Sequence, residues 1–248
     1  MTQETANITL VRDIAEAIEQ EIALAIMFHE TWKPSAYDKE LHERMGNSYA
    51  TQSFNIVRTA LRREMLMALA RLWEHGAKSI SIPTIGRTLS SPEFFGEFCA
   101  YRASRLRANT ISLTPEIDFS VHHDNAVKCT LEKSRAELDA LIAKYERGGS
   151  HYEVIKRLMT LRNGSLAHRQ KQPKKAAGAD STDDEIEEFY QDNLEIVRLI
   201  IHIVLARAFD LTEAAGVYRT YAGFFWSGTR GERTAGHPRF RPPPPRDE

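Results

Sequence analysis

Apolar side chains recur at steps of three and four residues along almost the whole chain, which is the spacing of one face of an α-helix. The pattern predicts helices over residues 5–30, 48–74, 83–89, 92–108, 125–147 and 182–208, and one that starts at 152 and runs into 161–170. Pro34 is expected to end the first helix and Gly76 to cap the helix over 48–74. The one β-like stretch, 79–82, is too short to build a sheet. We therefore expect an all-α fold, a bundle of five to six long helices.

The last long segment carries the strongest helix signal. Thr182 and Glu185 have the spacing of a capping box, in which each side chain satisfies a free backbone N–H of the other residue. The segment then presents one broad apolar face, made by Ile186, Phe189, Tyr190, Leu194, Val197, Ile201, Val204 and Ala208.

Composition excludes several classes of protein. Of 248 residues, 42% are apolar, which is enough for a core, and the net charge is −1, so bulk charge does not favour coating of duplex DNA. Cys99 and Cys129 form no CxxC pair and no disulfide framework, which favours a reduced, cytoplasmic location. The polar N-terminus is unlike a signal peptide, and the apolar run at 199–206 is too short to span a bilayer, so no membrane association is expected.

Two changes in composition suggest how the chain is organised. Residues 171–182 are polar and rich in small side chains, as expected of a flexible exposed loop. Residues 216–248 hold an aromatic segment and then a tail with prolines at 242–245, which predicts disorder. We expect one helical domain over 1–215, followed by this aromatic segment and tail.

Charge is concentrated before the last long helix. Between residues 154 and 179 there are seven basic side chains and no acid, and residues 180–188 then hold six acids and no base. The basic side chains are Lys156, Arg157, Arg162, Arg169, Lys171, Lys174 and Lys175. Such a cluster suits an anion or phosphate, but on charge alone the favoured interpretation is a solvated loop whose two halves attract each other.

Arg162, Asn163 and His168 lie within this stretch and have a coherent chemistry. Arginine is a permanently charged fork for phosphate oxygens, histidine exchanges a proton near neutral pH, and asparagine orients either partner. In a straight helix a six-residue step separates two side chains by about 120° and about 9 Å. A bend at Gly164-Ser165, or a second copy of the chain, is needed to bring Arg162 and His168 together.

No carboxylate lies near His168 in the sequence, and there is no P-loop, HExxH motif or serine-nucleophile elbow. The economical chemistry is metal-independent and uses no cofactor: His168 activates a ribose 2′-OH while Arg162 stabilises the charged phosphorane. DNA lacks that hydroxyl, so the substrate is expected to be RNA. A metal ligand brought from elsewhere in the fold stays open.

The segment LRNGSLAHRQ resembles the R-[N/D/H]-x(3–5)-H signature of the HEPN superfamily of helical ribonucleases. Its Arg-Asn and Ala-His pairs resemble the motif of the U-type abortive-infection branch of that superfamily. The resemblance covers about residues 5–212 as a helical pattern and 161–169 as a motif. It implies a homodimer with two facing motifs, metal-independent RNA cleavage that leaves a cyclic phosphate, and a role in phage defence or toxin–antitoxin systems. It also implies that Arg162 contacts phosphate, Asn163 assists and His168 does acid–base work.

Three basic neighbours, Arg157, Arg169 and Lys171, are our further candidates for contact with RNA phosphate. The resemblance to toxin families implies a protein or nucleotidyltransferase antitoxin as a partner. In some members the antitoxin modifies a tyrosine two residues after the histidine; Gln170 stands there, which argues against that form of regulation. The alternative function is a noncatalytic HEPN-like module that binds a nucleotide, RNA or a protein.

Other polar groups have simpler interpretations. His122 and His123 are expected in an exposed loop and helix cap rather than at a metal. His202 is expected to be a hydrogen-bonded interior or edge histidine. Tyr101 precedes a set of three arginines, Arg102, Arg105 and Arg107, which either extends an RNA-binding surface or simply solvates a helix.

Overall fold

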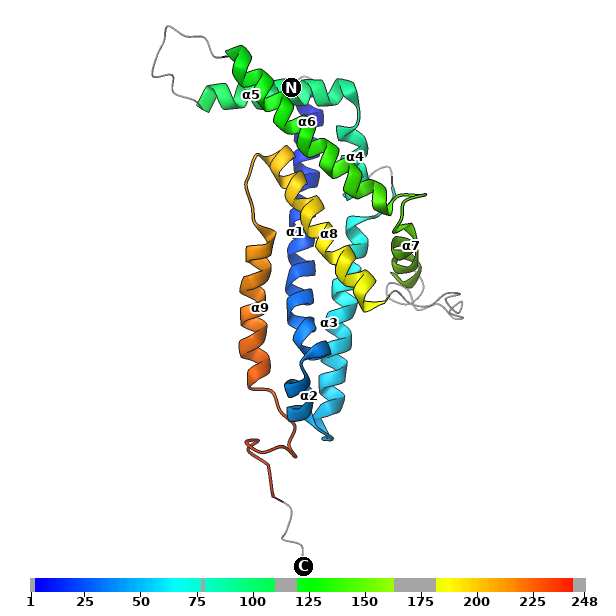
Figure 1. Cartoon of the computed structure of the whole chain (residues 1–248), viewed down its shortest axis with the longest axis vertical. Helices are drawn as coiled ribbons and strands as arrows, with labels where there is room; N and C mark the ends of the chain where they lie inside the picture. The colour runs from blue at the N-terminus through cyan, green and yellow to red at the C-terminus, as the bar shows by residue number, and fades with distance from the viewer. Residues whose placement is uncertain (1–2, 77–78, 110–119, 163–181, 243–248) are drawn as a thin grey trace, which may run out of the picture. The chain divides into compact units, whose positions relative to one another are not determined.

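The computed structural model describes residues 3–76, 79–109, 120–162 and 182–242. Within these ranges the chain forms nine α-helices and one π-helical segment, with no strand, which confirms the all-α prediction (Figure 1). The elements are α1 (Gln3–Tyr37), α2 (Lys39–Met45), α3 (Ala50–Leu72), α4 (Ile82–Leu89), α5 (Pro92–Asn109), α6 (Ser120–Tyr145), α7 (Tyr152–Leu161), α8 (Asp183–Ile200), η2 (Ile201–Leu205) and α9 (Leu211–Ser227). Six of these described helices have 17 residues or more, as expected.

The chain divides into two compact units. The first comprises Met1–Ile22 and Leu69–Phe209, and the second comprises Ala23–Ala68 and Asp210–Glu248. Helices α1 and α3 therefore contribute residues to both units. The domain boundary that we expected at residue 215 falls inside α9.

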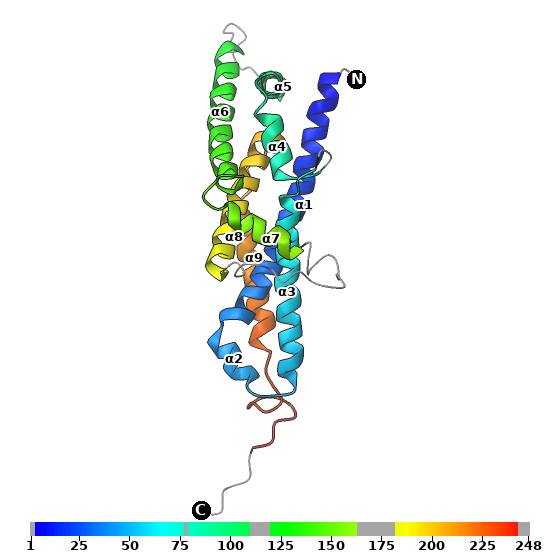
Figure 2. The same cartoon turned by 90° about the vertical axis from the view of Figure 1, so that its right-hand side faces the viewer.

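The first unit is built around α6. This helix packs against α4, α5, α7 and α8, and Figure 2 shows α4 and α5 beside it. The core contains the rings of Trp73, Tyr145 and Phe189, whose centroids lie 5.5 Å (Trp73–Tyr145) and 4.9 Å (Tyr145–Phe189) apart. Trp73 Nε1 donates to Asn193 Oδ1 at 2.8 Å, and Asn193 Nδ2 donates to the Phe189 carbonyl at 2.7 Å. A fully buried amide is thus satisfied on both sides, as burial requires.

Helix α8 starts as predicted and ends in an unexpected way. Both bonds of the capping box are present: Glu185 N–H to Thr182 Oγ1 at 3.2 Å and Thr182 N–H to Glu185 Oε2 at 2.8 Å. At its other end the helix widens into the π-helical η2, and Ala206 adopts a left-handed conformation with φ 59°. The helix expected to reach residue 208 therefore stops at 205, because a left-handed residue cannot continue it.

Two predicted helix ends lie elsewhere. The expectation that Pro34 ends the first helix is wrong, since α1 continues to Tyr37. A proline removes only its own N–H, and the later bond from Asp38 N–H to the Pro34 carbonyl forms at 2.9 Å. Helix α3 ends at Leu72 rather than at His75-Gly76: the N–H groups of Trp73 and Glu74 donate to carbonyls three residues earlier, so the last turn tightens and the helix stops.

Helix α6 begins before its predicted start at residue 125. Its first residue is Ser120, so His122 and His123 lie inside a helix and not in a loop with a cap, which corrects that expectation. The expected loop at 109–118 lies, apart from its first residue, outside the described residues.

The second unit buries a small cluster that consists of Leu41, Met45, Phe54, Ala222 and Trp226. Trp226 on α9 packs edge-on against Phe54, and its Nε1 donates to the Thr31 carbonyl of α1 at 2.8 Å. Asp210 caps α9 by accepting the backbone N–H groups of Thr212 and Glu213. The expected aromatic segment from residue 216 is thus helical through Ser227, and residues 243–248 of the tail lie outside the described part.

The second unit also buries a carboxylate. Glu30 and its neighbour His29 are each 1% exposed, with Glu30 Oε1 3.0 Å from His29 Nδ1. Arg219 of α9 donates through Nε to Glu30 Oε2 at 2.9 Å. Burial raises the pKa of Glu30, but the hydrogen bonds and charges of His29 and Arg219 outweigh it, so the pKa is lowered from 4.5.

The lowered pKa of Glu30 makes stability depend on pH. Because its folded pKa lies below the unfolded value, its contribution is complete above about pH 4.5 and is lost as pH falls through the folded pKa. Glu30→Gln is therefore expected to lower the free energy of unfolding at pH 7. At pH 3 the difference in the free energy of unfolding between this variant and wild type should be smaller. Urea midpoints at the two pH values measure this difference. Glu40→Gln, on an exposed carboxylate, is the control; an equal pH effect in both variants contradicts the assignment.

Candidate functional site

Helix α7 carries the described part of the predicted site. Its apolar face, Val154, Ile155 and Leu158, is buried, and the helix ends at Leu161 with Arg162 as its C-cap. Arg157 and Arg162 are the predicted site residues that the structure places. Asn163, His168, Arg169 and Lys171 lie outside the described residues, as does the expected loop up to residue 181.

The guanidinium of Arg162 forms an ion pair with a carboxylate that the sequence did not predict. Arg162 Nη2 donates to Oε1 of Glu74, two residues beyond the end of α3. The Arg162 side chain is 25% exposed and that of Glu74 34%. The buried Nε of Arg162 has no hydrogen-bond partner among the described residues. The group is thus held by Glu74 on one side, and the rest of its side chain stays partly exposed.

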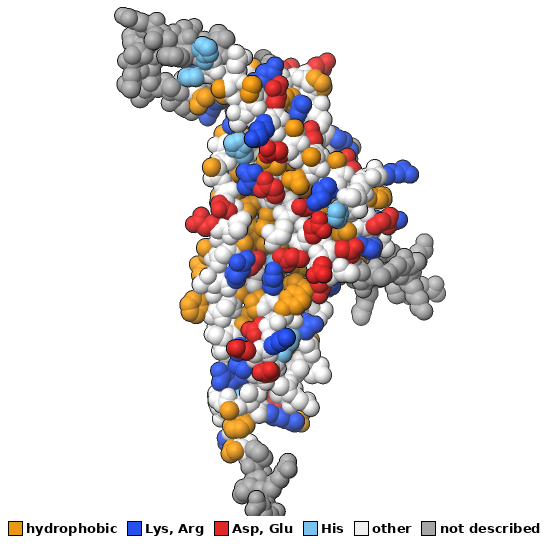
Figure 3. All heavy atoms as spheres, in the orientation of Figure 1, with side chains coloured by type: hydrophobic (Ala, Val, Ile, Leu, Met, Phe, Trp, Pro, Cys, Tyr) orange, Lys and Arg blue, Asp and Glu red, His pale blue; other side chains and the backbone are white. Residues whose placement is uncertain are grey.

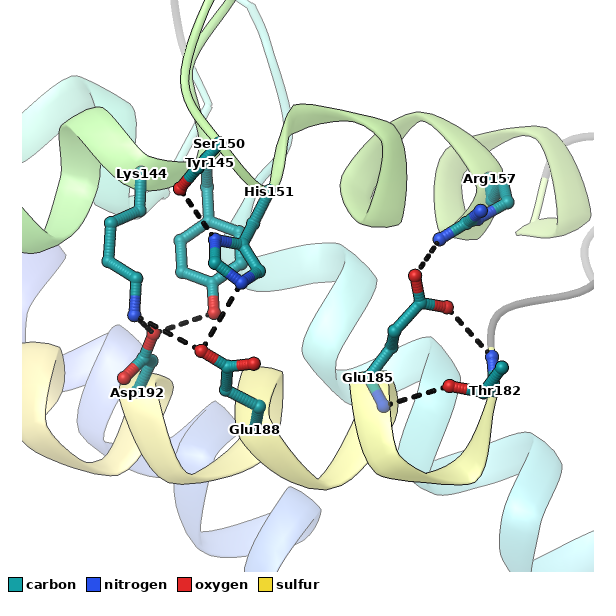
Figure 4. Close-up of polar contacts among 9 residues, drawn as sticks. All are labelled: Lys144, Tyr145, Ser150, His151, Arg157, Thr182, Glu185, Glu188 and Asp192. Carbon is teal, nitrogen blue, oxygen red and sulfur yellow. Dashed lines mark hydrogen bonds and ion pairs between the residues drawn. The ribbon is translucent and has the colours of Figure 1, made fainter.

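Arg157 is engaged by an acid at the start of α8. Its Nη2 lies 2.6 Å from Glu185 Oε1, while the other oxygen of the same carboxylate accepts the Thr182 N–H of the capping box (Figure 4). The bond from the Thr182 backbone and the charge of Arg157 lower the pKa of Glu185. One carboxylate therefore caps α8 and joins it to α7.

A second polar network fixes the beginning of α7 to α8 (Figure 4). His151 Nε2 lies 3.2 Å from Glu188 Oε1, and its Nδ1 lies 2.7 Å from Ser150 Oγ. Tyr145 donates through its hydroxyl to Asp192 at 2.7 Å; burial and this bond raise the pKa of Tyr145. Because both ring nitrogens of His151 are engaged, we assign this network to structure and not to proton transfer.

The remaining predicted positions are dispersed. His202 lies partly exposed in η2, where it has no hydrogen-bond partner among the described residues, unlike our expectation. Burial lowers the pKa of His202, as do the charges of Arg102 and Arg198. His122 is exposed on α6. Across the described ranges no group of three or more His, Cys, Asp or Glu is placed to hold a metal.

The charges on the visible face are mixed. Figure 3 shows acidic and basic side chains side by side rather than in separate fields, in keeping with the net charge of −1. No helix in the described part of the chain is both long and apolar enough to cross a membrane.

The comparison with known proteins identifies the family. The model of the AbiU2 family, an abortive-infection family of the HEPN superfamily, matches residues 10–225, a span that includes the R-N-x4-H sequence at 162–168. No curated protein and no solved structure matches the chain. Because the family model covers most of its length and the described fold is all-α, the chain belongs to the AbiU2 family of the HEPN superfamily.

Proposed function

We propose that this protein is a metal-independent endoribonuclease of the phage-defence or toxin type, with Arg162 and His168 as its catalytic pair and Asn163 as their assistant. The observation that carries the proposal is the AbiU2 family match over residues 10–225, with the R-N-x4-H sequence inside it.

In the proposed reaction the RNA supplies its own nucleophile. His168 removes the proton from a ribose 2′-OH, and the 2′-oxygen attacks the adjacent phosphorus. The bond from phosphorus to the 5′-oxygen breaks, and this oxygen takes up a proton, which leaves a 2′,3′-cyclic phosphate and a 5′-hydroxyl. Arg162 donates to the non-bridging oxygens while negative charge develops on them.

The contact between Arg162 and Glu74 supports this role for the guanidinium. A carboxylate that holds Nη2 limits the rotation of a long, flexible side chain, which stays partly exposed. Glu74 is thus a positioning residue in the proposal: it orients the charged fork and does not touch the substrate.

The proposal also includes the oligomeric state of the protein and its binding partners. We propose a homodimer in which a second copy brings its motif close to the first, since six residues separate Arg162 from His168 along the chain. Arg157, Arg169 and Lys171 are proposed to contact RNA phosphates, and a protein antitoxin or nucleotidyltransferase is the proposed neutralising partner.

Arg162→Lys is expected to lower the rate of RNA cleavage by about 10²-fold, because an ammonium keeps the charge but not the fork of donors. The measurement is single-turnover cleavage of a fluorogenic RNA in EDTA. Arg147→Lys, on an exposed arginine in the turn after α6, is the matched control and should cleave like wild type. Full activity of Arg162→Lys would count against a bidentate phosphate contact.

A further inference from the structure

A groove of about 710 Å³ lies between the first part of α1 and α5, within the first unit. Figure 2 shows where these two helices lie. Its walls include Arg12 from α1 and Tyr101, Arg105 and Arg107 from α5. Arg12 Nη1 lies 3.5 Å from the Tyr101 hydroxyl, so the two helices present a guanidinium and an aromatic ring together. Arg162, the described residue of the proposed catalytic motif, is not among the described residues that line this groove.

The arginines of the groove differ in how they are used. Arg107 is paired with Asp124 of α6, whereas Arg105 is exposed and has no ion pair among the described residues. Arg12 is half-buried, and within the described residues its guanidinium has no hydrogen bond or ion pair other than that to the Tyr101 hydroxyl. Arg12 and Arg105 therefore remain available for an anion.

A third guanidinium adds to the positive charge next to Arg12. Arg102 donates through Nη1 to the carbonyl of Ile203 in η2 at 2.8 Å, and that bond leaves its charge without compensation. Burial lowers the pKa of Arg102, and the charge of Arg12 lowers it further, so the two groups repel each other. A bound anion relieves this repulsion, since it attracts both guanidinium groups.

Two carboxylates in the same groove narrow the class of ligand. Asp13 and Glu97 also line it, and they disfavour a plain polyanion that has only negative groups to offer. A single-stranded nucleic acid has both kinds of group: phosphates for arginines and exocyclic amino groups for carboxylates. It also has bases that stack on aromatic rings such as that of Tyr101.

We propose that the groove between α1 and α5 binds a single-stranded segment of RNA, with Arg12 and Arg105 on phosphates and Tyr101 against a base. The inference deepens the proposed function and rests on it for RNA as the substrate. It adds a binding site for RNA outside the motif, on different helices of the same unit.

The test is the salt dependence of RNA binding by the full chain in a His168→Ala background, which prevents cleavage. The probe is a fluorescent 20-nucleotide single-stranded RNA, followed by anisotropy between 50 and 200 mM salt. Arg12→Gln/Arg105→Gln is expected to weaken binding on the order of 10-fold at low salt and to reduce the salt slope by about 1.4, at about 0.7 per phosphate lost. Arg58→Gln/Arg87→Gln removes two charges outside the groove and is the control.

A variant that keeps every charge tests the base contact. Tyr101→Leu is expected to weaken binding of RNA about 10-fold, as stacking on an aromatic ring contributes about that much, and to leave binding of heparin unchanged. Circular dichroism confirms that each variant is folded. An unchanged salt slope in the arginine variant, an equal loss in the control, or an equal loss for heparin in Tyr101→Leu overturns the inference.

The outcomes separate this inference from the proposed function. If the wild-type chain cuts RNA but the groove variants bind it normally, the inference fails and the proposed function stands. If the groove variants lose affinity although the wild-type chain never cuts RNA, the groove stands and the nuclease assignment fails. If the chain does not bind RNA at all, both are overturned.

Discussion

His168→Ala is expected to lower the rate of RNA cleavage by about 10²–10⁴-fold, the usual contribution of a general acid–base residue. Alanine removes the group that exchanges the proton of the 2′-OH, while Arg162 and the other basic side chains keep their charges. Binding of RNA and helical content should therefore be preserved, and growth inhibition by the expressed protein should disappear.

The measurement compares wild type with His168→Ala in EDTA on an all-RNA substrate and on the same sequence with 2′-deoxy sugars. The deoxy substrate should resist both proteins, because it lacks the nucleophile. His122→Ala, on an exposed histidine of α6, is the control for loss of an imidazole. Cleavage retained by His168→Ala, free of contaminating nuclease, would defeat the catalytic assignment. Tight binding without cleavage by wild type would favour the noncatalytic module.

Trp73→Ala is expected to lower the free energy of unfolding by about 3–5 kcal/mol, the range for a large aromatic residue removed from a core. The indole contacts the rings of Tyr145 and Phe189, and its N–H donates to the side-chain oxygen Oδ1 of Asn193. Its loss leaves a cavity and also a buried acceptor without a partner. Urea unfolding measures the change.

Trp73→Phe separates the two contributions. Phenylalanine keeps an aromatic ring but has no N–H, so the unpaired Asn193 oxygen should account for about 1–3 kcal/mol of the loss. Asn193→Ala in the Trp73→Phe background is expected to recover part of it. A loss below about 1 kcal/mol for Trp73→Ala would contradict the central place of this residue in the core.

The helices were predictable because burial repeats with the period of the helix. Ile186, Phe189 and Leu194 are buried on α8 as their spacing required, and the capping box at Thr182 formed with both of its bonds. Such signals are local: a few neighbouring residues contain all the information.

The helix ends were less predictable, because the spacing of apolar side chains does not fix the residue at which a helix stops. The sequence near Pro34 does not show that α1 continues past this proline. The sequence near Leu72 does not show that α3 stops before Trp73, whose indole enters the core. The π-helical segment that ends at left-handed Ala206 is a similar case; the carbonyl of Ile203 within it accepts a hydrogen bond from Arg102 of α5. Tertiary packing sets these features, and periodicity does not record it.

The site was predictable only in part. The chemistry of Arg162 could be inferred from its neighbours in the motif, but Glu74 lies 88 residues away and has no motif around it. The basic stretch likewise suggested an anion site, and the ion pair between Arg157 and Glu185 became apparent only from the packing of α7 on α8. The placement of Asn163 and His168 stays a prediction.

The adjacency of Trp73 and Glu74 has a consequence for genetics. The indole is anchored in the core and the very next side chain holds Arg162, so a substitution that shifts the anchor also shifts the carboxylate. If the protein inhibits growth as the proposed function requires, changes at Trp73 should therefore appear beside those in the motif among cells selected to survive its expression. Some of these alleles should be conditional, harmless at high temperature and toxic again in the cold.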